Sequence, residues 1–452
     1  MFKRILIANR GEIALRIIRC CREMDIETVQ VYSEADKQSL PVMLATYSVC
    51  IGPAKAADSY LKEDNIIEVA RKMNCDAIHP GYGFLSENAG FAKKCEENGI
   101  TFIGPSAKII EKMGDKQAAR KLMIKHKVPV VPGSKGLVKT AEEAEEIAEE
   151  IGYPVLIKAA FGGGGKGMRK VFSKEELKKS FETAKAEAKA AFGNDAMYME
   201  KLILKPRHIE FQILADQHGN VVYLGERDCS IQRRNQKLLE ETPAWNLSEE
   251  TRKAMGETAV RAAKAAGYFS AGTIEFVVDG EGNYYFIEMN TRIQVEHPVT
   301  EEVTGIDLIK EQIRIAAGMT LAMKQEDIVT QGHAIECRIN AEQPGKIDFL
   351  HFPAGCGVRV DSHLYSGYEI SPYYDSMLVK VIATGRTRLE AIRKMRRALQ
   401  EIIIDGVKTN VEFMHLLMYH GDFIRGRYNT AFWEENSETI AKWMEEGING
   451  GD

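Results

Sequence analysis

Gly272-Thr-Ile-Glu-Phe-Val-Val-Asp279 and Tyr284-Tyr-Phe-Ile-Glu-Met-Asn290 are two runs rich in β-branched and aromatic residues, and Gly280-Glu-Gly-Asn283 separates them. Runs of this composition predict strands, and a short glycine-containing segment between two of them predicts a hairpin loop. We therefore expect a β-hairpin near the middle of the chain.

Acidic side chains come together if this hairpin pairs in register. Pairing Asp279 with Tyr284 sets Glu275 opposite Glu288, and Asn290 shares the face of Glu288 because strand side chains alternate. Like charges opposite each other destabilise a sheet, whereas a divalent cation between them offsets the repulsion. Carboxylate and amide oxygens are the ligands that magnesium takes beside phosphates. We interpret the hairpin as a magnesium-nucleotide site; the alternative is an exposed edge hairpin with solvated acids.

The composition indicates a globular enzyme rather than a nucleic-acid or membrane protein. The chain has 452 residues, a net charge of -5 and 44% hydrophobic residues, which predicts about three domains and no nucleic-acid partner. Eight cysteines lie scattered without a CxxC pair, so we expect a reducing compartment. The chain opens directly on a predicted strand, with no apolar segment suited to a signal peptide or a membrane span. We expect a cytoplasmic protein.

The first hundred residues alternate predicted strands and helices. Strands are predicted at 5–8, 27–32 and 77–79, and helices at 12–23 and 65–72. This alternation favours a doubly wound parallel sheet, with ligand-facing loops after strand ends at 9–12 and 79–88. The alternative for 9–12 is a simple helix cap.

A glycine-rich loop follows in the second part of the chain. A charged stretch at 140–151 predicts an exposed helix, and strands are predicted at 155–160 and around 170–172. Between them Phe161-Gly-Gly-Gly-Gly-Lys166 continues with Gly167, so a Walker loop, which needs Ser or Thr there, is excluded. Four glycines let backbone amides approach phosphate oxygens and let a hairpin move as a lid. The alternative is a flexible surface turn.

Two further segments carry charge suited to an anion. Arg227-Asp-Cys-Ser-Ile-Gln-Arg-Arg-Asn-Gln-Lys237 is cationic and lacks the aromatic residues of a nucleic-acid site. After the hairpin, an extended Thr291–Pro298 places Arg292, Gln294 and Glu296 on one face beside the metal. An arginine next to a carboxylate suits an anionic substrate that must lose a proton; the alternative is a surface ion pair.

Four stretches resemble the ATP-grasp superfamily and, within it, the biotin carboxylase family, the ATP-using component of biotin-dependent carboxylases. They are Ile7-Ala-Asn-Arg-Gly-Glu-Ile-Ala14, His79-Pro-Gly-Tyr-Gly-Phe-Leu-Ser-Glu-Asn88, Phe286-Ile-Glu-Met-Asn-Thr-Arg-Ile-Gln-Val-Glu-His-Pro298 and Glu336-Cys-Arg-Ile-Asn-Ala-Glu342. The resemblance covers nearly the whole chain.

The resemblance implies a set of site residues. ATP contacts are implied for Lys116, Lys158, Gly164, Gly165, Glu200, Lys201, Ile203, His208, Asn235, Glu275 and Glu288. Magnesium or manganese is implied on Glu275, Glu288 and Asn290. Bicarbonate is implied at Lys237, Arg292, Gln294 and Val295, with Glu296 as the base. Biotin, the carrier-bound substrate, is implied beside Tyr82 and Arg338, with Asp375 paired to that arginine.

The same resemblance implies the reaction and the architecture. Bicarbonate attacks the γ-phosphate of ATP to give carboxyphosphate, whose carbon dioxide is transferred to biotin. The expected fold is α/β, in part α+β. It comprises an N-terminal Rossmann-like domain at 1–113, an ATP-grasp domain at 114–318 with a glycine-rich lid at about 131–203, and a mixed C-terminal biotin carboxylase domain at 331–446.

Two positions depart from the family pattern. Asn235 replaces the usual histidine of the Arg-Arg-His-Gln-Lys run, so one contact near the nucleotide is in doubt. Gln343-Pro-Gly345 follows Glu342 at once, where the family commonly has a longer loop, so the rim on the substrate side is expected to be shorter.

The expected partners are a separate biotin carboxyl carrier protein and carboxyltransferase subunits, with acetyl-CoA or pyruvate as the final acceptor. A homodimer is expected too, because Arg16, Arg19 and Glu23 resemble residues used in the family's dimers; a solvated helix face is the alternative. Two other functions are considered, namely another ATP-grasp carboxylate-amine ligase and a non-catalytic carboxylase scaffold.

Overall fold

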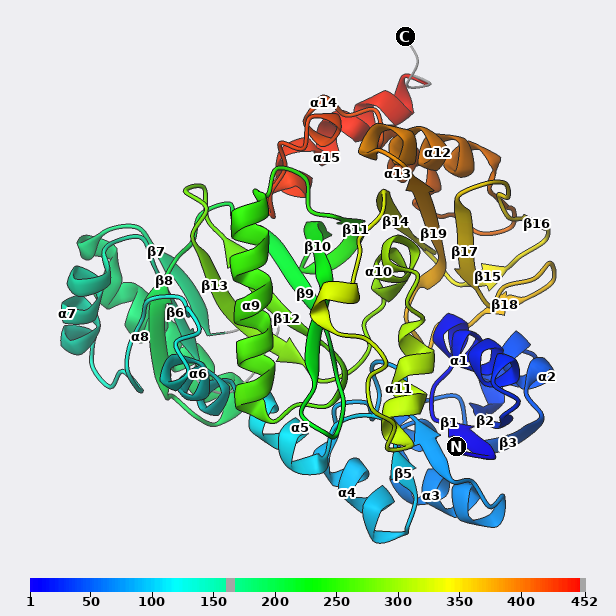
Figure 1. Ribbon diagram of the computed structural model, residues 1–452. Coiled ribbons are helices and arrows are strands. Elements are labelled where there is room, and N and C mark those ends of the chain that lie inside the picture. The colour runs from blue at the N-terminus through cyan, green and yellow to red at the C-terminus, as the bar shows by residue number, and fades with distance from the viewer. Residues whose placement is uncertain (160–166, 448–452) are drawn as a thin grey trace. The chain divides into compact units, whose positions relative to one another are not determined.

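The computed structural model describes residues 1–159 and 167–447 (Figure 1). Its contacts divide the chain into two compact units. The first comprises Met1–Val128, Arg207–Phe276 and Glu288–Asp452, and the second comprises Pro129–Pro206 and Val277–Ile287. The segment expected to be a lid lies within the second unit.

The first unit begins with a five-stranded parallel sheet in the order β3-β2-β1-β4-β5. Its strands are β1 (Arg4–Ile7), β2 (Glu27–Ser33), β3 (Tyr47–Gly52), β4 (Ala77–His79) and β5 (Thr101–Phe102). The helices of this region are α1 (Gly11–Glu23), α2 (Leu40–Leu44), α3 (Glu63–Lys72), α4 (Ala89–Glu97), α5 (Ala107–Gly114) and α6 (Lys116–Lys125). The predicted parallel sheet is confirmed.

Local chemistry accounts for these elements. Ile5, Leu6 and Ile7 are fully buried, as expected for a central parallel strand covered on both faces. The chain then turns through Gly11, whose φ of +69° favours glycine, and enters α1. Asn88 starts α4 by accepting a hydrogen bond from the amide of Phe91.

A second sheet has the strand order β13-β12-β9-β10-β11-β14-β19-β17. Its strands are β9 (Arg207–Ala215), β10 (Val221–Arg233), β11 (Gln236–Thr242), β12 (Ser270–Val278), β13 (Tyr284–Asn290), β14 (His333–Asn340), β17 (Val358–Ser362) and β19 (Met377–Gly385). The ladders from β9 through β10, β11, β14 and β19 to β17 are antiparallel. Helix α9 (Glu249–Ala266) lies along β9 and β10, and α10 (His297–Thr304) packs on β10, β11, β14 and β19 (Figure 1).

The remaining elements of the first unit complete its core. Helix α11 (Leu308–Ala316) contacts α1, and α12 (Arg388–Glu401) packs on β14 and β19. The last helices are α13 (Val411–Leu417), α14 (Gly421–Ile424) and α15 (Phe432–Glu445). Two small ribbons pair β15 (Gly345–Lys346) with β18 (Glu369–Ile370) and β16 (Leu350–His351) with β20 (Ile403–Ile404).

The second unit is a three-stranded antiparallel sheet, β7-β6-β8, packed against two helices. Its elements are α7 (Ala141–Ile151), β6 (Val155–Ala159), β7 (Met168–Val171), α8 (Lys174–Phe192) and β8 (Met197–Lys201). Thr140 caps α7 by accepting from the amide of Glu143. Ala144 and Ala148 are fully buried, so this helix, predicted to be exposed, has one face in the core.

Two local predictions are wrong. At the tip of the β12–β13 hairpin, the amide of Asp279 donates to the carbonyl of Asn283 rather than pairing with Tyr284, because the chain turns tightly through Gly282 at φ +88°, whose amide donates to the carbonyl of Asp279. After β13 the chain does not stay extended either. The amide of His297 donates to the carbonyl of Gln294, and α10 begins at once.

Candidate active site

An ammonium group lies among three carboxylates in the first unit. Lys237 Nζ on β11 lies 2.6 Å from Glu210 Oε2, 2.5 Å from Glu296 Oε1 and 3.4 Å from Glu275 Oε1. Burial by itself would lower the pKa of Lys237, but Cys229 and the surrounding carboxylates raise it well above its usual value. Lys237 is therefore a fixed cation near neutral pH.

Glu296, at the start of α10, lies between two cations. Its Oε1 accepts from Lys237, and its Oε2 accepts from Arg338 Nη2 at 2.8 Å. Burial opposes ionisation, but Lys237, Arg338 and Arg227 hold the pKa of Glu296 well below its usual value. The result is a buried, ionised carboxylate, which is the protonation state that a general base requires.

Glu275 and Glu288 lie close enough for their charges to interact. Burial and then the charge of Glu275 raise the pKa of Glu288, while Lys116, 3.6 Å away, lowers it. Glu275 is ordered by His208 Nε2 at 2.9 Å and by Asn290 Nδ2, which donates at 2.7 Å. Two mutually repelling carboxylates fit a hard divalent cation such as magnesium. The oxygen of Asn290 already accepts from Arg292.

Two further groups of side chains have metal-binding spacing. His208, Glu210 and Glu275 offer ligand atoms within 4.8 Å of one another, as do Glu210, Cys229 and Glu296. Both sets include carboxylates that Lys237 contacts, so an ammonium already supplies positive charge there. Glu275 and Glu288 are the better pair for an added cation.

The residues between β13 and α10 are held by hydrogen bonds. Arg292 Nε donates to Glu87 Oε2 at 2.9 Å. Gln294 Nε2 donates to Glu275 Oε1 at 2.9 Å, and its Oε1 accepts from Arg227 Nη2 at 2.8 Å. Gln294 is therefore hydrogen-bonded both to the Glu275 carboxylate and to Arg227, which is fully buried.

A second network runs beneath the same segment. The carbonyl of Val295 accepts from Lys380 Nζ at 2.9 Å, and this ammonium also lies 3.1 Å from Glu12 Oε1. The hydroxyl of Tyr82 donates to Glu12. Lys380 is fully buried, so it connects the glycine-containing loop of Tyr82 with the segment that ends at Glu296.

Asn235 lies in the tight turn between β10 and β11. Arg233 pairs with Gln236, and the two residues of the turn, Arg234 and Asn235, have φ values of +52° and +64°. Two successive positive φ angles define a type I′ turn, which favours asparagine. The residue that departs from the family pattern is thus suited to the local backbone.

The other predicted nucleotide residues fall in the second unit. Lys158 and Glu200 form an ion pair across β6 and β8, and Lys201 Nζ donates to the carbonyls of Gly152 and Tyr153 at 3.0 and 2.8 Å. Ile203 follows β8 and is partly buried. Gly164 and Gly165 lie outside the described residues.

Comparison with known proteins decides the family. The family model of the biotin carboxylase N-terminal domain matches residues 1–110, that of the carbamoyl-phosphate synthase L chain ATP-binding domain matches 115–324, and that of the biotin carboxylase C-terminal domain matches 336–435. Biotin carboxylase 1 of Bacillus subtilis is 58% identical over 443 residues, covering 96% of this chain and 98% of that protein. The chain belongs to the biotin carboxylase family.

Other members of the biotin carboxylase family act in different carboxylases. A pyruvate carboxylase subunit of Methanothermobacter thermautotrophicus is 52% identical over 443 residues, covering 96% of this chain and 90% of that protein. The biotin carboxylase domain of Hydrogenobacter thermophilus 2-oxoglutarate carboxylase, solved as a dimer with MgADP, ADP and bicarbonate, is 50% identical with a TM-score of 0.90, covering 97% and 99% of the two chains. The expected fold class is confirmed.

Sequence reasoning missed Glu210 and Glu240. Glu210 is fully buried and paired at 2.6 Å with Arg227, which was predicted to belong to a cationic segment suited to an anion and is itself fully buried. Glu240 contacts Arg338. Glu210 stands among apolar residues of β9, and a charged residue within an apolar strand is a signal that could have found it. Asp375, expected to pair with Arg338, instead accepts from the amide of Met377 at 2.8 Å.

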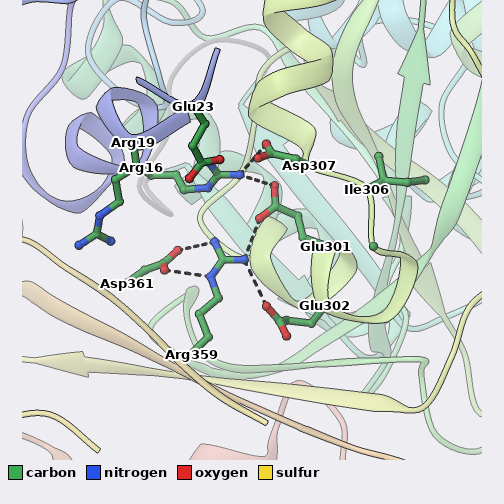
Figure 2. A pocket seen from close by; sticks show the side chains of 10 residues that line it. Arg16, Arg19, Glu23, Glu301, Glu302, Ile306, Asp307, Arg359 and Asp361 are labelled. Atoms are coloured by element: carbon green, nitrogen blue, oxygen red, sulfur yellow. Dashed lines mark hydrogen bonds and ion pairs between the residues drawn. The ribbon is translucent and has the colours of Figure 1, made fainter. Parts of the chain in front are cut away.

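The residues expected in a dimer contact lie together around one pocket. Arg16, Arg19 and Glu23 of α1 line a pocket of about 330 Å³. Figure 2 shows Arg16 directed toward Glu301 and Asp307, with ion-pair distances of 3.0 and 2.6 Å.

Of the helices that the structure describes, none has the length and apolarity needed to cross a membrane. All eight cysteines are free.

Proposed function

We propose that the protein uses ATP and bicarbonate to carboxylate biotin carried on a separate carrier protein. The observation that carries this proposal is the ionised Glu296 carboxylate held between Lys237 at 2.5 Å and Arg338 at 2.8 Å. Relatives support it, since the biotin carboxylase domain of 2-oxoglutarate carboxylase was solved with bound bicarbonate.

The first step activates bicarbonate. Lys237, Arg292, Gln294 and Val295 hold the anion, and Glu296 accepts its proton. The deprotonated oxygen attacks the γ-phosphorus of ATP, a P–O bond forms, and ADP leaves. Lys237 and Arg292 provide positive charge where negative charge develops, which is the main contribution that a protein makes to phosphoryl transfer.

The second step moves the carboxyl group to biotin. Carboxyphosphate separates into carbon dioxide and phosphate, and the phosphate removes the proton from the ureido nitrogen of biotin. The nitrogen then forms a bond with carbon dioxide, giving carboxybiotin. Arg338 stabilises the oxyanion of the ureido group, and Tyr82, ordered by its bond to Glu12, lines the biotin side.

Nucleotide contacts are proposed for Lys116, His208, Asn235, Glu275 and Glu288 of the first unit. Glu275 and Glu288, with Asn290, would hold magnesium or manganese, which neutralises phosphate charge when bound. Lys158, Glu200, Lys201 and Ile203 of the second unit, together with Gly164 and Gly165, stay predictions from the resemblance.

Domains, partners and location complete the proposal. The proposed domains are 1–113, 114–318 with a lid at about 131–203, and 331–446. A homodimer is supported by the dimer of a relative's biotin carboxylase domain and by the charged pocket at α1. The carrier protein, the carboxyltransferase subunits, the cytoplasmic location and the acceptor, acetyl-CoA or pyruvate, stay predictions.

The test is magnesium-dependent ATP hydrolysis by the purified chain, with and without bicarbonate and free biotin. We expect turnover that requires bicarbonate, rises with biotin and disappears in Glu288→Ala and Arg338→Ala. Turnover indifferent to bicarbonate would identify a different ATP-grasp ligase. Nucleotide binding without turnover would identify a scaffold, and Asn235→His would then be assayed.

A further inference from the structure

Two fully buried glutamates face each other next to Arg338. Glu240 on β11 is the direct partner of Glu336 on β14 in the antiparallel ladder, and both residues are 0% exposed. Directly opposed residues lie on the same face of a sheet, with Cβ atoms about 4.5–5.5 Å apart. The two carboxyl groups therefore lie side by side in the interior of the sheet, beneath α10.

The cations near this pair are already engaged with other carboxylates. Arg338 contacts Glu240 and donates to Glu296. Lys380, the ladder partner of Arg338, lies 3.1 Å from Glu12. Both oxygens of Glu336 lack a hydrogen-bond partner. Neither Arg338 nor Lys380 forms an ion pair with Glu336.

The charged and titratable groups that face the pair come from every neighbouring element. They are Lys237 and Glu240 on β11, Glu336, Cys337 and Arg338 on β14, Cys229 on β10, Lys380 on β19, Glu296 at the start of α10, and Tyr82. The set contains three carboxylates and three cations, but two of the cations are shared with carboxylates outside it: Lys380 with Glu12 and Asp361, and Lys237 with Glu210 and Glu275.

We propose that Glu240 and Glu336 hold one proton between them, and that this shared proton limits the negative charge facing Arg338. Two adjacent buried carboxylates repel each other strongly, and the one cation that contacts the pair, Arg338, is shared with Glu296, so both cannot stay ionised. A protonated carboxyl donates its O–H to an oxygen of its neighbour, which gives one oxygen of each residue a hydrogen-bond partner. Burial raises the pKa of Glu240 to about 7 and raises that of Glu336 well above its usual value, and the charge of Glu240 adds to the shift of Glu336.

The inference deepens the proposed function and rests on it for its consequence. Arg338 can stabilise the ureido oxyanion only while its own charge is not overcompensated. Glu240 and Glu296 already contact it, so ionisation of Glu336 would add a third negative charge and oppose the oxyanion. Glu240 and Glu336 are thus positioning residues that act through Arg338.

The first test is the pH dependence of thermal stability, which requires no activity. The folded pair keeps a proton that the unfolded chain releases above about pH 4.5, so the wild type loses stability as the pH rises. Glu336→Gln removes this loss. The quantity to compare is the Tm of Glu336→Gln minus the Tm of the wild type. We expect this difference to be about 2 °C larger at pH 8.5 than at pH 6. The same difference at both pH values would overturn the proposal.

A neighbouring residue provides the matched control. Glu241 is equally buried, but on the other face of the sheet it contacts His333 at 2.6 Å and Arg388 at 2.7 Å. Glu241→Gln should shift Tm by the same amount at pH 6 and pH 8.5. If Glu336→Gln does not fold, Glu240→Gln takes its place, because loss of either carboxylate removes the shared proton. An infrared spectrum of the wild type at pH 8 without a protonated-carboxyl band would also refute it.

A kinetic readout then links the pair to Arg338. The alkaline decline of kcat for biotin carboxylation should move to higher pH in Glu336→Gln, whereas a purely structural role would lower kcat equally at all pH values. If the wild type does not carboxylate biotin, the proposed function fails while the stability test of the shared proton still stands.

Discussion

Lys380 Nζ donates a 2.9 Å hydrogen bond to the carbonyl oxygen of Val295, and the side chain is fully buried. The same ammonium pairs with Glu12 at 3.1 Å. Val295 immediately precedes Glu296, so this bond fixes the backbone at the proposed bicarbonate site. A buried cation thereby joins Glu12 of α1 to the backbone next to the proposed base.

Lys380→Met keeps the side-chain length but removes the donor and leaves Glu12 without its cation. Loss of one partner of a buried pair costs about 3–5 kcal/mol, and displacement of Val295 should lower kcat/KM for bicarbonate by about tenfold or more. Urea unfolding and bicarbonate kinetics measure the two effects. Lys72→Met, which removes an exposed pair with Glu68, is the control and should change the free energy of unfolding by less than about 0.5 kcal/mol. Unchanged bicarbonate kinetics would contradict the assigned role.

Glu288→Gln removes one of the two acids proposed to hold magnesium. Without metal the variant should be at least as stable as the wild type, because the repulsion from Glu275 that acts on Glu288 is gone. The gain in Tm that MgADP gives the wild type should shrink in the variant, since a ligand stabilises a protein in proportion to its affinity. Glu281→Gln, in the exposed tip of the same hairpin, should keep the full gain. An undiminished MgADP effect in Glu288→Gln would exclude this residue as a ligand.

The turn at Asn235 gives a prediction about backbone conformation. A β-branched side chain at φ +64° is strained, so Asn235→Val should cost about 1–2 kcal/mol of folding free energy. Asn235→His should change stability by less than about 0.5 kcal/mol, because histidine also tolerates positive φ. Urea denaturation of the two variants compares them directly. Equal stabilities would show that the turn adapts to either residue.

The sequence predicted the elements that depend on local pattern. Alternating strands and helices gave the parallel sheet, with the strand at 77–79 matched residue for residue, and the runs around Glu275 and Glu288 gave β12 and β13. The family motifs gave Lys237, Glu296 and Arg338, which the structure brings together. These features are encoded in short segments.

Long-range features were not predictable in the same way. The pairing of Glu240 with Glu336 joins residues nearly a hundred positions apart, and strand register over such a separation depends on the packing of the whole sheet. The predicted pairing of Asp279 with Tyr284 was wrong because the chain turns tightly through Gly282 at positive φ, which sets Asp279 against Asn283 instead. The turn into α10 was not predicted, because His297 and Pro298 are as compatible with the end of an extended segment as with the start of a helix.

Glu241 gives the last prediction, which concerns acid stability. Burial opposes ionisation, but His333 and Arg388 lower the pKa of Glu241 to about 2 from its usual 4.5. A depressed folded-state pKa contributes stability that is complete above about pH 4.5 and is lost as the pH falls toward 2. The shift corresponds to about 3 kcal/mol.

Glu241→Gln should therefore lose about 3 kcal/mol at pH 7 and progressively less below pH 4.5, giving a flatter acid limb than the wild type. Urea unfolding at pH 7, 5 and 3 measures the limb. Glu434→Gln, an exposed carboxylate on α15, is the control and should follow the wild type throughout. A loss in Glu241→Gln that is the same at pH 3 as at pH 7 would mean that packing, rather than the charge held by His333 and Arg388, sets the contribution of this residue.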